Sequence, residues 1–92
     1  MREIIRFPHG VRRYRLLVEE IYRSDQVIRY RVSGRNRSIV LQTNEPFFRN
    51  RGMKLRRPDW KLIEGRVNEP GFVNKIIEIM QVRRKELESK GL

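Results

Sequence analysis

Residues 27–43 decide the fold of this chain, and they read VIRYRVSGRNRSIVLQT. In the first part of this stretch Ile28, Tyr30 and Val32 fall on one side of an extended chain, and the intervening arginines fall on the other. The cluster at 33–36 contains glycine and asparagine, which readily adopt the backbone angles of tight turns. The alternation on both sides of this turn predicts a β-hairpin with one apolar and one basic face.

The register of this hairpin follows from a loop over residues 34–37. The expected cross-strand pairs are Val32 with Ile39, Tyr30 with Leu41, Ile28 with Thr43, Arg31 with Val40 and Arg29 with Gln42. The first three pairs make an apolar face, and the last two make a basic and polar face. Such a division is typical of an antiparallel sheet that is buried on one side only.

A further strand is expected over residues 14–22, which are rich in branched and aromatic side chains. Its turn into the next strand leaves two registers open. A two-residue loop pairs Ile21 with Ile28 and Glu20 with Arg29, whereas a three-residue loop pairs Tyr22 with Ile28 and Glu19 with Arg31. Both place a glutamate across from an arginine, so side-chain chemistry does not choose between them.

The segment 45–59 is expected to be a long loop, because Pro46 and Pro58 lack the N–H that a central strand needs. After it, residues 60–64 predict a short strand that ends at Gly65.

Residues 68–92 predict a helix. Asn68 is a suitable cap, and Glu69 places negative charge in the first turn. Its apolar residues share one face, consisting of Phe72, Val73, Ile76, Ile77, Met80 and Leu87. We expect this face to cover the apolar side of the sheet.

The expected architecture is a single α+β domain, an antiparallel three- to four-stranded meander packed against one C-terminal amphipathic helix. Residues 1–11 are a candidate flexible arm, 12–67 form the basic sheet part, and 68–92 form the helix. A chain of 92 residues leaves no room for a second independent core. This layout is similar to that of small DNA-binding modules such as the amino-terminal domains of certain integrases, and the similarity is one of architecture alone.

The inventory of reactive groups argues against catalysis. The chain has no cysteine, which excludes disulfides, thiolate metal sites and thiol nucleophiles. Its one histidine, His9, has no carboxylates at ligand spacing, and no phosphate-binding glycine motif occurs. A metal-free ribonuclease acting through arginine and lysine is less favoured, since small basic toxins of that kind carry helices ahead of their sheet. We therefore expect no enzyme activity, no cofactor, no metal and no small-molecule substrate.

No apolar stretch approaches the length of about 20 residues that spans a bilayer, and the amino terminus lacks the apolar region of a signal peptide. We expect a soluble, cytoplasmic protein that does not enter a membrane.

Charge is the most informative feature of the composition. The formal net charge is +11, and 17 of the 22 basic residues are arginine. Residues 1–67 carry 17 basic and 7 acidic side chains, whereas 68–92 carry 5 and 4, so the sheet part holds almost all of the excess. Arginine binds phosphate through a planar fork of donors, which indicates a polyanionic partner.

Two groups of residues are candidates for contact with nucleic acid. On the predicted sheet face and its turn they are Arg29, Arg31, Arg35 and Arg37. In the predicted loop they are Arg49, Arg51, Lys54, Arg56 and Arg57. The loop is favoured because it has few carboxylates nearby, whereas Glu19 or Glu20 is available to neutralise the sheet arginines. A third patch, Arg12, Arg13 and Arg15, is expected if the first strand lies at a sheet edge.

The leading hypothesis is a non-catalytic domain that binds DNA or RNA. The alternative is a protein-interaction or assembly module, either a homo-oligomer or the partner of an acidic protein. Its motivation is the large number of apolar residues in the helix, namely Phe72, Ile76, Ile79, Met80 and Val82, which exceeds what one sheet face readily covers.

Overall fold

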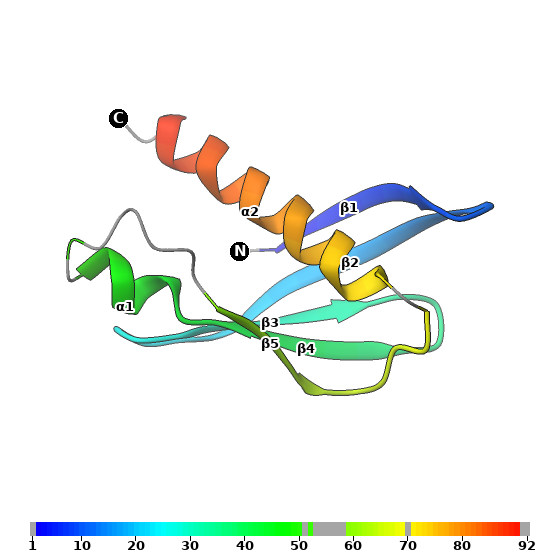
Figure 1. Cartoon of the computed structure of the whole chain (residues 1–92), viewed down its shortest axis with the longest axis horizontal. Coiled ribbons are helices and arrows are strands. Elements are labelled where there is room, and N and C mark those ends of the chain that lie inside the picture. Colours follow the sequence, from blue (N-terminus) through cyan, green and yellow to red (C-terminus); the bar gives the residue numbers. More distant parts are fainter. Residues whose placement is uncertain (1, 51, 53–58, 70, 91–92) are drawn as a thin grey trace.

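The computed structural model describes residues 2–50, 52, 59–69 and 71–90, and it describes side chains for these except 49, 50 and 84–90. Five strands form one antiparallel sheet in the order β1-β2-β3-β4-β5, and the long helix α2 lies across one face (Figure 1). The elements are β1 (Arg2–His9), β2 (Arg12–Arg23), β3 (Ile28–Ser33), β4 (Ser38–Thr43), α1 (Glu45–Asn50), β5 (Trp60–Glu64) and α2 (Phe72–Lys90). The small α+β class is confirmed, whereas the expected count of three to four strands is wrong.

The additional strand is β1, in the segment that was interpreted as an arm. Ile5 and Phe7 are buried, while the alternating neighbours Ile4 and Arg6 are exposed, so the segment has the two-residue period of a half-buried strand. It pairs antiparallel with β2 along its whole length, from Arg2 opposite Glu19 to His9 opposite Arg12. β1 therefore belongs to the sheet and supplies part of its core.

The register of the β3–β4 hairpin is confirmed at every expected pair, including Val32 opposite Ile39 and Tyr30 opposite Leu41. In the β2–β3 hairpin, Glu19 lies opposite Arg31, as the three-residue loop requires. The ladder then shifts between Glu20 and Tyr22, so that Tyr22 lies opposite Arg29 rather than Ile28. An extra residue in one strand produces such a bulge, and neither simple register allows for it.

The core lies between the concave face of the sheet and α2. Every strand from β1 to β4 contributes to it, and α2 adds Ile76 and Met80, both fully buried. Trp60 at the start of β5 stacks on Tyr30, with ring centroids 5.9 Å apart. Trp60 is thus part of the packing, as a domain of this size requires of its largest side chains.

The segment between β4 and β5 is not a loop throughout, because it begins with α1. Pro46 falls in the first turn of α1, where its missing N–H removes no intrahelical hydrogen bond. Asn44 connects this segment to β5, since its side-chain Oδ1 accepts a hydrogen bond from the backbone N–H of Asp59 at 2.7 Å.

The start of the long helix differs from the expected position. α2 begins at Phe72, after Gly71 with its positive φ of 76°, rather than at a cap on Asn68. Its first turn contains no acidic residue. Glu69 instead lies before the helix and binds a side chain of β2, as described below. Within the described part of the chain, no helix combines the length and the apolarity needed to cross a membrane.

Candidate nucleic-acid interface

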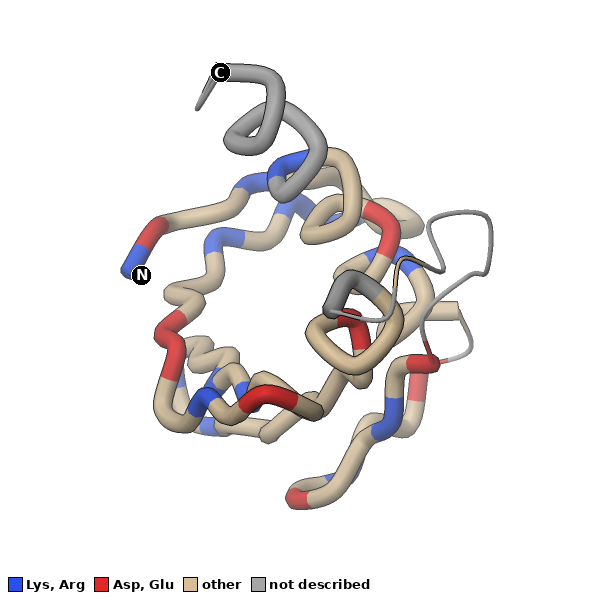
Figure 2. Tube along the Cα trace, turned by 90° about the vertical axis from the view of Figure 1, so that its left-hand side faces the viewer, with Lys and Arg blue, Asp and Glu red and all other residues tan. Residues whose placement is uncertain are grey.

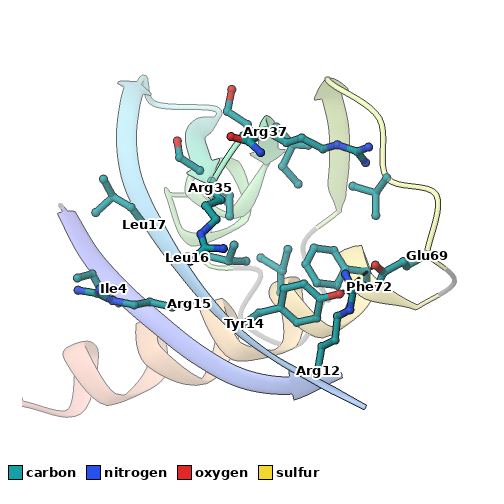
Figure 3. Close-up of a pocket in the computed structure, with 18 of the residues that line it drawn as sticks. Ile4, Arg12, Tyr14, Arg15, Leu16, Leu17, Arg35, Arg37, Glu69 and Phe72 are labelled. Carbon is teal, nitrogen blue, oxygen red and sulfur yellow. Dashed lines mark hydrogen bonds between the residues drawn. The ribbon is translucent and has the colours of Figure 1, made fainter. Parts of the chain in front are cut away.

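A groove opens where β2 extends beyond β3. Residues 12–16 of β2 pair with β1 on one side, but the ladder between β2 and β3 runs only from Leu17 opposite Ser33 to Arg23 opposite Ile28. The groove lies between this edge of β2, the β3–β4 turn at 34–37 and the segment 66–69 that leads to α2 (Figure 3). Its volume is about 1550 Å³.

Arginine dominates the lining of this groove. Arg2 lies near its end and faces Glu19, with 3.9 Å between Nε and Oε2. The six other arginines are Arg12, Arg13, Arg15, Arg35, Arg37 and Arg66, of which Arg13 and Arg15 lie on the outer side of β2. All six are exposed, and none forms an ion pair with a carboxylate that the structure describes. We call them the groove arginines.

The two carboxylates of the lining, Glu3 and Glu69, have other partners. Glu3 Oε2 lies 3.9 Å from Nε of Arg83 on α2, and Glu69 accepts a hydrogen bond from Tyr14. Neither carboxylate pairs with a groove arginine. The groove therefore keeps a strongly positive potential, which a polyanion can neutralise.

One wall of the groove depends on Gly65, at the end of β5. Gly65 has a φ of 89°, and a Cβ built on it would lie 2.8 Å from both the backbone oxygen of Ser38 and Cγ2 of Ile39. Only glycine fits this close approach without displacing backbone. The approach brings Arg66 beside Arg37, and these two line a smaller hollow of about 320 Å³ with Ser38 and Asn68.

The opposite end of the groove holds aromatic rings and a carboxylate (Figure 3). The Tyr14 hydroxyl donates a hydrogen bond to Glu69, 2.9 Å from Oε1 and 3.0 Å from Oε2, and the Tyr14 ring lies 4.8 Å from that of Phe72. His9 Nε2 lies 4.0 Å from Oε2 of Glu69. The hydrogen bond to Glu69, with desolvation and the negative charge, raises the pKa of Tyr14, while Arg12 opposes this rise.

The floor of the groove is apolar. Leu16, Ile39 and Ile76 line it, and they belong to the buried core. Val67 and Phe72 are half-buried and add apolar surface along the side of α2. The groove thus combines a cationic rim with an apolar floor.

The outer face of the sheet carries the other described candidates, Arg29 and Arg31, both exposed. Glu19 lies directly opposite Arg31 in the ladder, and its described ion pair is with Arg2; the described ion pair of Glu20 is with Arg23. Arg29 instead donates a hydrogen bond to Oε1 of Gln42 at 2.8 Å, and its guanidinium lies over the Tyr22 ring, 5.0 Å from the centroid. Its charge is therefore exposed, but its geometry is fixed by neutral partners.

On the same outer face Arg6 and Arg15 lie directly opposite each other on β1 and β2, and both are exposed. Like charges in this position destabilise a sheet. Figure 2 shows that basic residues are spread over several strands rather than confined to one segment.

The sequence-based candidates thus divide into three places. Arg35 and Arg37 lie at the groove, and Arg29 and Arg31 lie on the outer face. The side chain of Arg49, and Arg51, Lys54, Arg56 and Arg57 entirely, lie outside the described residues. α1, which contains the backbone of Arg49, lies at the end of the sheet opposite the tip of the β1–β2 hairpin (Figure 1).

Arg66 is the groove residue that the sequence reasoning missed. Its position follows from the antiparallel pairing of β4 with β5, in which Glu64 lies opposite Val40. The residues after β5 therefore lie beside the start of β4 and the adjacent turn. The pairing of β4 with β5 is the signal from which the position of Arg66 could have been predicted.

None of the protein-family models, curated proteins or solved structures compared with this chain matches it. Within the described part of the chain, no three side chains among histidine, aspartate and glutamate gather as a metal site would require. The five-stranded sheet also departs from the three-stranded layout that resembled integrase domains. The groove and its charges are therefore the features of this chain that bear on its function.

Proposed function

We propose that this chain is a non-catalytic nucleic-acid-binding domain and that the groove arginines are its main contact surface. The observation that carries the proposal is a set of exposed arginines from three parts of the chain around one groove, without described carboxylate partners. Arg12, Arg35, Arg37 and Arg66 line it from within, and Arg13 and Arg15 line it from the outer side of β2. A group of unneutralised like charges is unfavourable in the free protein. A phosphate chain removes this repulsion and offers the oxygens that guanidinium groups bind in pairs.

The chemistry of the residues favours a phosphate polymer over a single small anion. The groove arginines come from separate elements and are spread along the groove and over the outer edge of β2, so a ligand that meets several of them must carry several charges. Phosphate contacts of this type position a nucleic acid without selecting its sequence.

The test is a titration of labelled oligonucleotides, followed by fluorescence anisotropy at several salt concentrations. The change is the triple variant Arg35→Gln, Arg37→Gln and Arg66→Gln. If three phosphate contacts are lost, the slope of log affinity against log salt should become shallower by about 2 to 3. The affinity at low salt should fall at least about tenfold.

A matched control removes the same charge from another place. The variant Arg29→Gln, Arg31→Gln and Lys61→Gln also lowers the net charge by three, but it acts on the outer face. We expect it to weaken binding less than the groove variant. Equal loss in the two variants would mean that only overall charge matters, and the absence of salt-dependent binding in the unchanged protein would remove the proposal. Whether Arg49, Arg51, Arg56 and Arg57 add to binding stays a prediction, tested by a separate Gln variant of these four.

The second candidate function is assembly with another copy through β5. This edge strand exposes Leu62 and Ile63, each at 39%. Exposed apolar edges favour pairing with another chain. On α2, by contrast, Ile76 and Met80 are covered by the sheet and Val82 is 53% exposed. Sedimentation velocity over a range of concentrations tests this candidate, and a strictly monomeric protein, unchanged by Ile63→Lys, counts against it.

A further inference from the structure

The groove has the shape of a missing strand. Over residues 12–16 no described strand pairs with β2 on the side that β3 occupies further along. Proteins that read a duplex insert a protruding helix or ribbon into one of its grooves. Here exposed arginines without a described carboxylate partner line a recess instead, and the complementary ligand is one narrow enough to enter it.

The arginine rim and the apolar floor of the groove match the two chemical parts of a single nucleic-acid strand, its phosphates and its bases. Arginines hold the rim, while the half-buried Val67 and Phe72 present apolar surface between them. An unpaired strand carries phosphates on one side and flat, weakly polar bases on the other, and single-strand sites combine cations with surfaces for bases. A duplex hides its bases, so it would cover the rim and leave the floor uncovered.

The smaller hollow supplies a defined place for one phosphate. Arg37 and Arg66 line it from two elements together with Ser38 and Asn68, two residues whose side chains carry neutral donors. The close approach at Gly65 fixes the separation between the two elements. The hollow thus offers charged and neutral donors together, as oxyanion sites do.

We infer that the groove binds single-stranded nucleic acid in preference to duplex, with one backbone phosphate held between Arg37 and Arg66. The inference rests on the proposed function and adds the form of the ligand and the position of one contact. The competing occupant, an acidic extended peptide added along the edge of β2, would also meet the arginines. Nucleic acid is favoured because its backbone carries a charge at every unit, which suits arginines spread along the groove and over its outer edge.

The experiment compares two probes with the same number of phosphates, a labelled oligothymidylate and a labelled DNA hairpin duplex, by anisotropy at one salt concentration. We expect the single strand to bind roughly tenfold more tightly, the effect of about one well-placed base. Equal or tighter binding of the duplex overturns the inference while leaving the proposed function intact. Failure of both probes, and of the matching RNAs, removes the proposed function itself.

A second arm tests the phosphate position with an isosteric change of charge. Asn68→Asp puts a carboxylate into the smaller hollow, and Asn74→Asp makes the same change at an exposed position on α2 outside the groove lining. We expect Asn68→Asp to weaken oligothymidylate binding about threefold to tenfold and Asn74→Asp to have less than a twofold effect. Equal effects overturn the position of the phosphate.

A third arm uses polyglutamate as competitor against the bound oligothymidylate. If polyglutamate displaces it at a lower concentration of charge than unlabelled oligothymidylate does, the groove prefers an acidic peptide and the inference is overturned. Circular dichroism of each variant checks that the fold is unchanged, which we expect because Asn68 and Asn74 are both exposed.

Discussion

Replacing Gly65 by alanine is the most direct test of how the groove is held together. The residue has a φ of 89°, and the new Cβ would lie 2.8 Å from both the Ser38 backbone oxygen and Cγ2 of Ile39. The backbone oxygen belongs to β4 and cannot rotate away as a flexible side chain does. The substitution must therefore shift either β4 or the segment that carries Arg66.

The magnitude follows from two contributions. An L side chain at positive φ costs about 1–2 kcal/mol, and overpacking against fixed atoms adds roughly 1–3 kcal/mol. The free energy of unfolding should fall by about 2–5 kcal/mol. For a domain of this size each kcal/mol lowers Tm by about 4–8 °C, so the fall in Tm should be at least about 8 °C.

The measurement is urea unfolding followed by circular dichroism, with Gly10→Ala as the matched control. Gly10 also has a positive φ, 63°, but a Cβ there meets no atom within 4 Å. The control carries the backbone strain alone, so the difference between the two variants isolates the contact with β4. If Gly65→Ala is no less stable than Gly10→Ala, the close approach does not hold the two elements together and the reasoning fails.

Two further predictions concern β1 and β2. Tyr14→Phe removes the hydrogen bond to Glu69. That bond raises the pKa of Tyr14 in the folded state, so the stability that the bond contributes is fully present below the ordinary tyrosine pKa of 10.0. This contribution is lost as the pH rises through the raised pKa. Urea unfolding should show the advantage of the unchanged protein over Tyr14→Phe shrinking above pH 10, and a constant difference would contradict it. Arg6→Glu replaces the like-charge pair of Arg6 and Arg15 by a pair of opposite charges. The free energy of unfolding should rise by about 0.5–1 kcal/mol at low salt, and added salt should diminish this gain. Destabilisation by this change would show that Arg6 has a favourable partner.

The β3–β4 hairpin could be predicted from the sequence because its pattern and its turn agree. Ile28, Tyr30 and Val32 alternate with arginines, and one loop length aligns them with Ile39 and Leu41. In the β2–β3 hairpin the residue pattern and the loop length do not fix one register. The ladder has a bulge near Ile21, and no residue pattern in the sequence signals it. The sequence of β1 did carry a strand signal, the alternation around Ile5 and Phe7, but this alternation is short and is followed by a proline.

The groove could not be predicted, because it depends on a mismatch of length between neighbouring strands. β2 has 12 residues and β3 has 6, so β2 continues past the point where its partner turns. The arginines of β2 were recognisable as a patch in the sequence. Their convergence with Arg35, Arg37 and Arg66 depends on the order and register of the whole sheet.

The order of the sheet has a consequence for synthesis of the chain. Each strand pairs with the strand next to it in sequence, so the sheet can assemble progressively as it leaves the ribosome. Ile76 and Met80, however, come from α2, which follows every strand. Until α2 emerges, the apolar face of the nascent sheet is exposed to solvent. A stalled or shortened translation product that stops before residue 72 is therefore the form of this protein most exposed to chaperones and proteases.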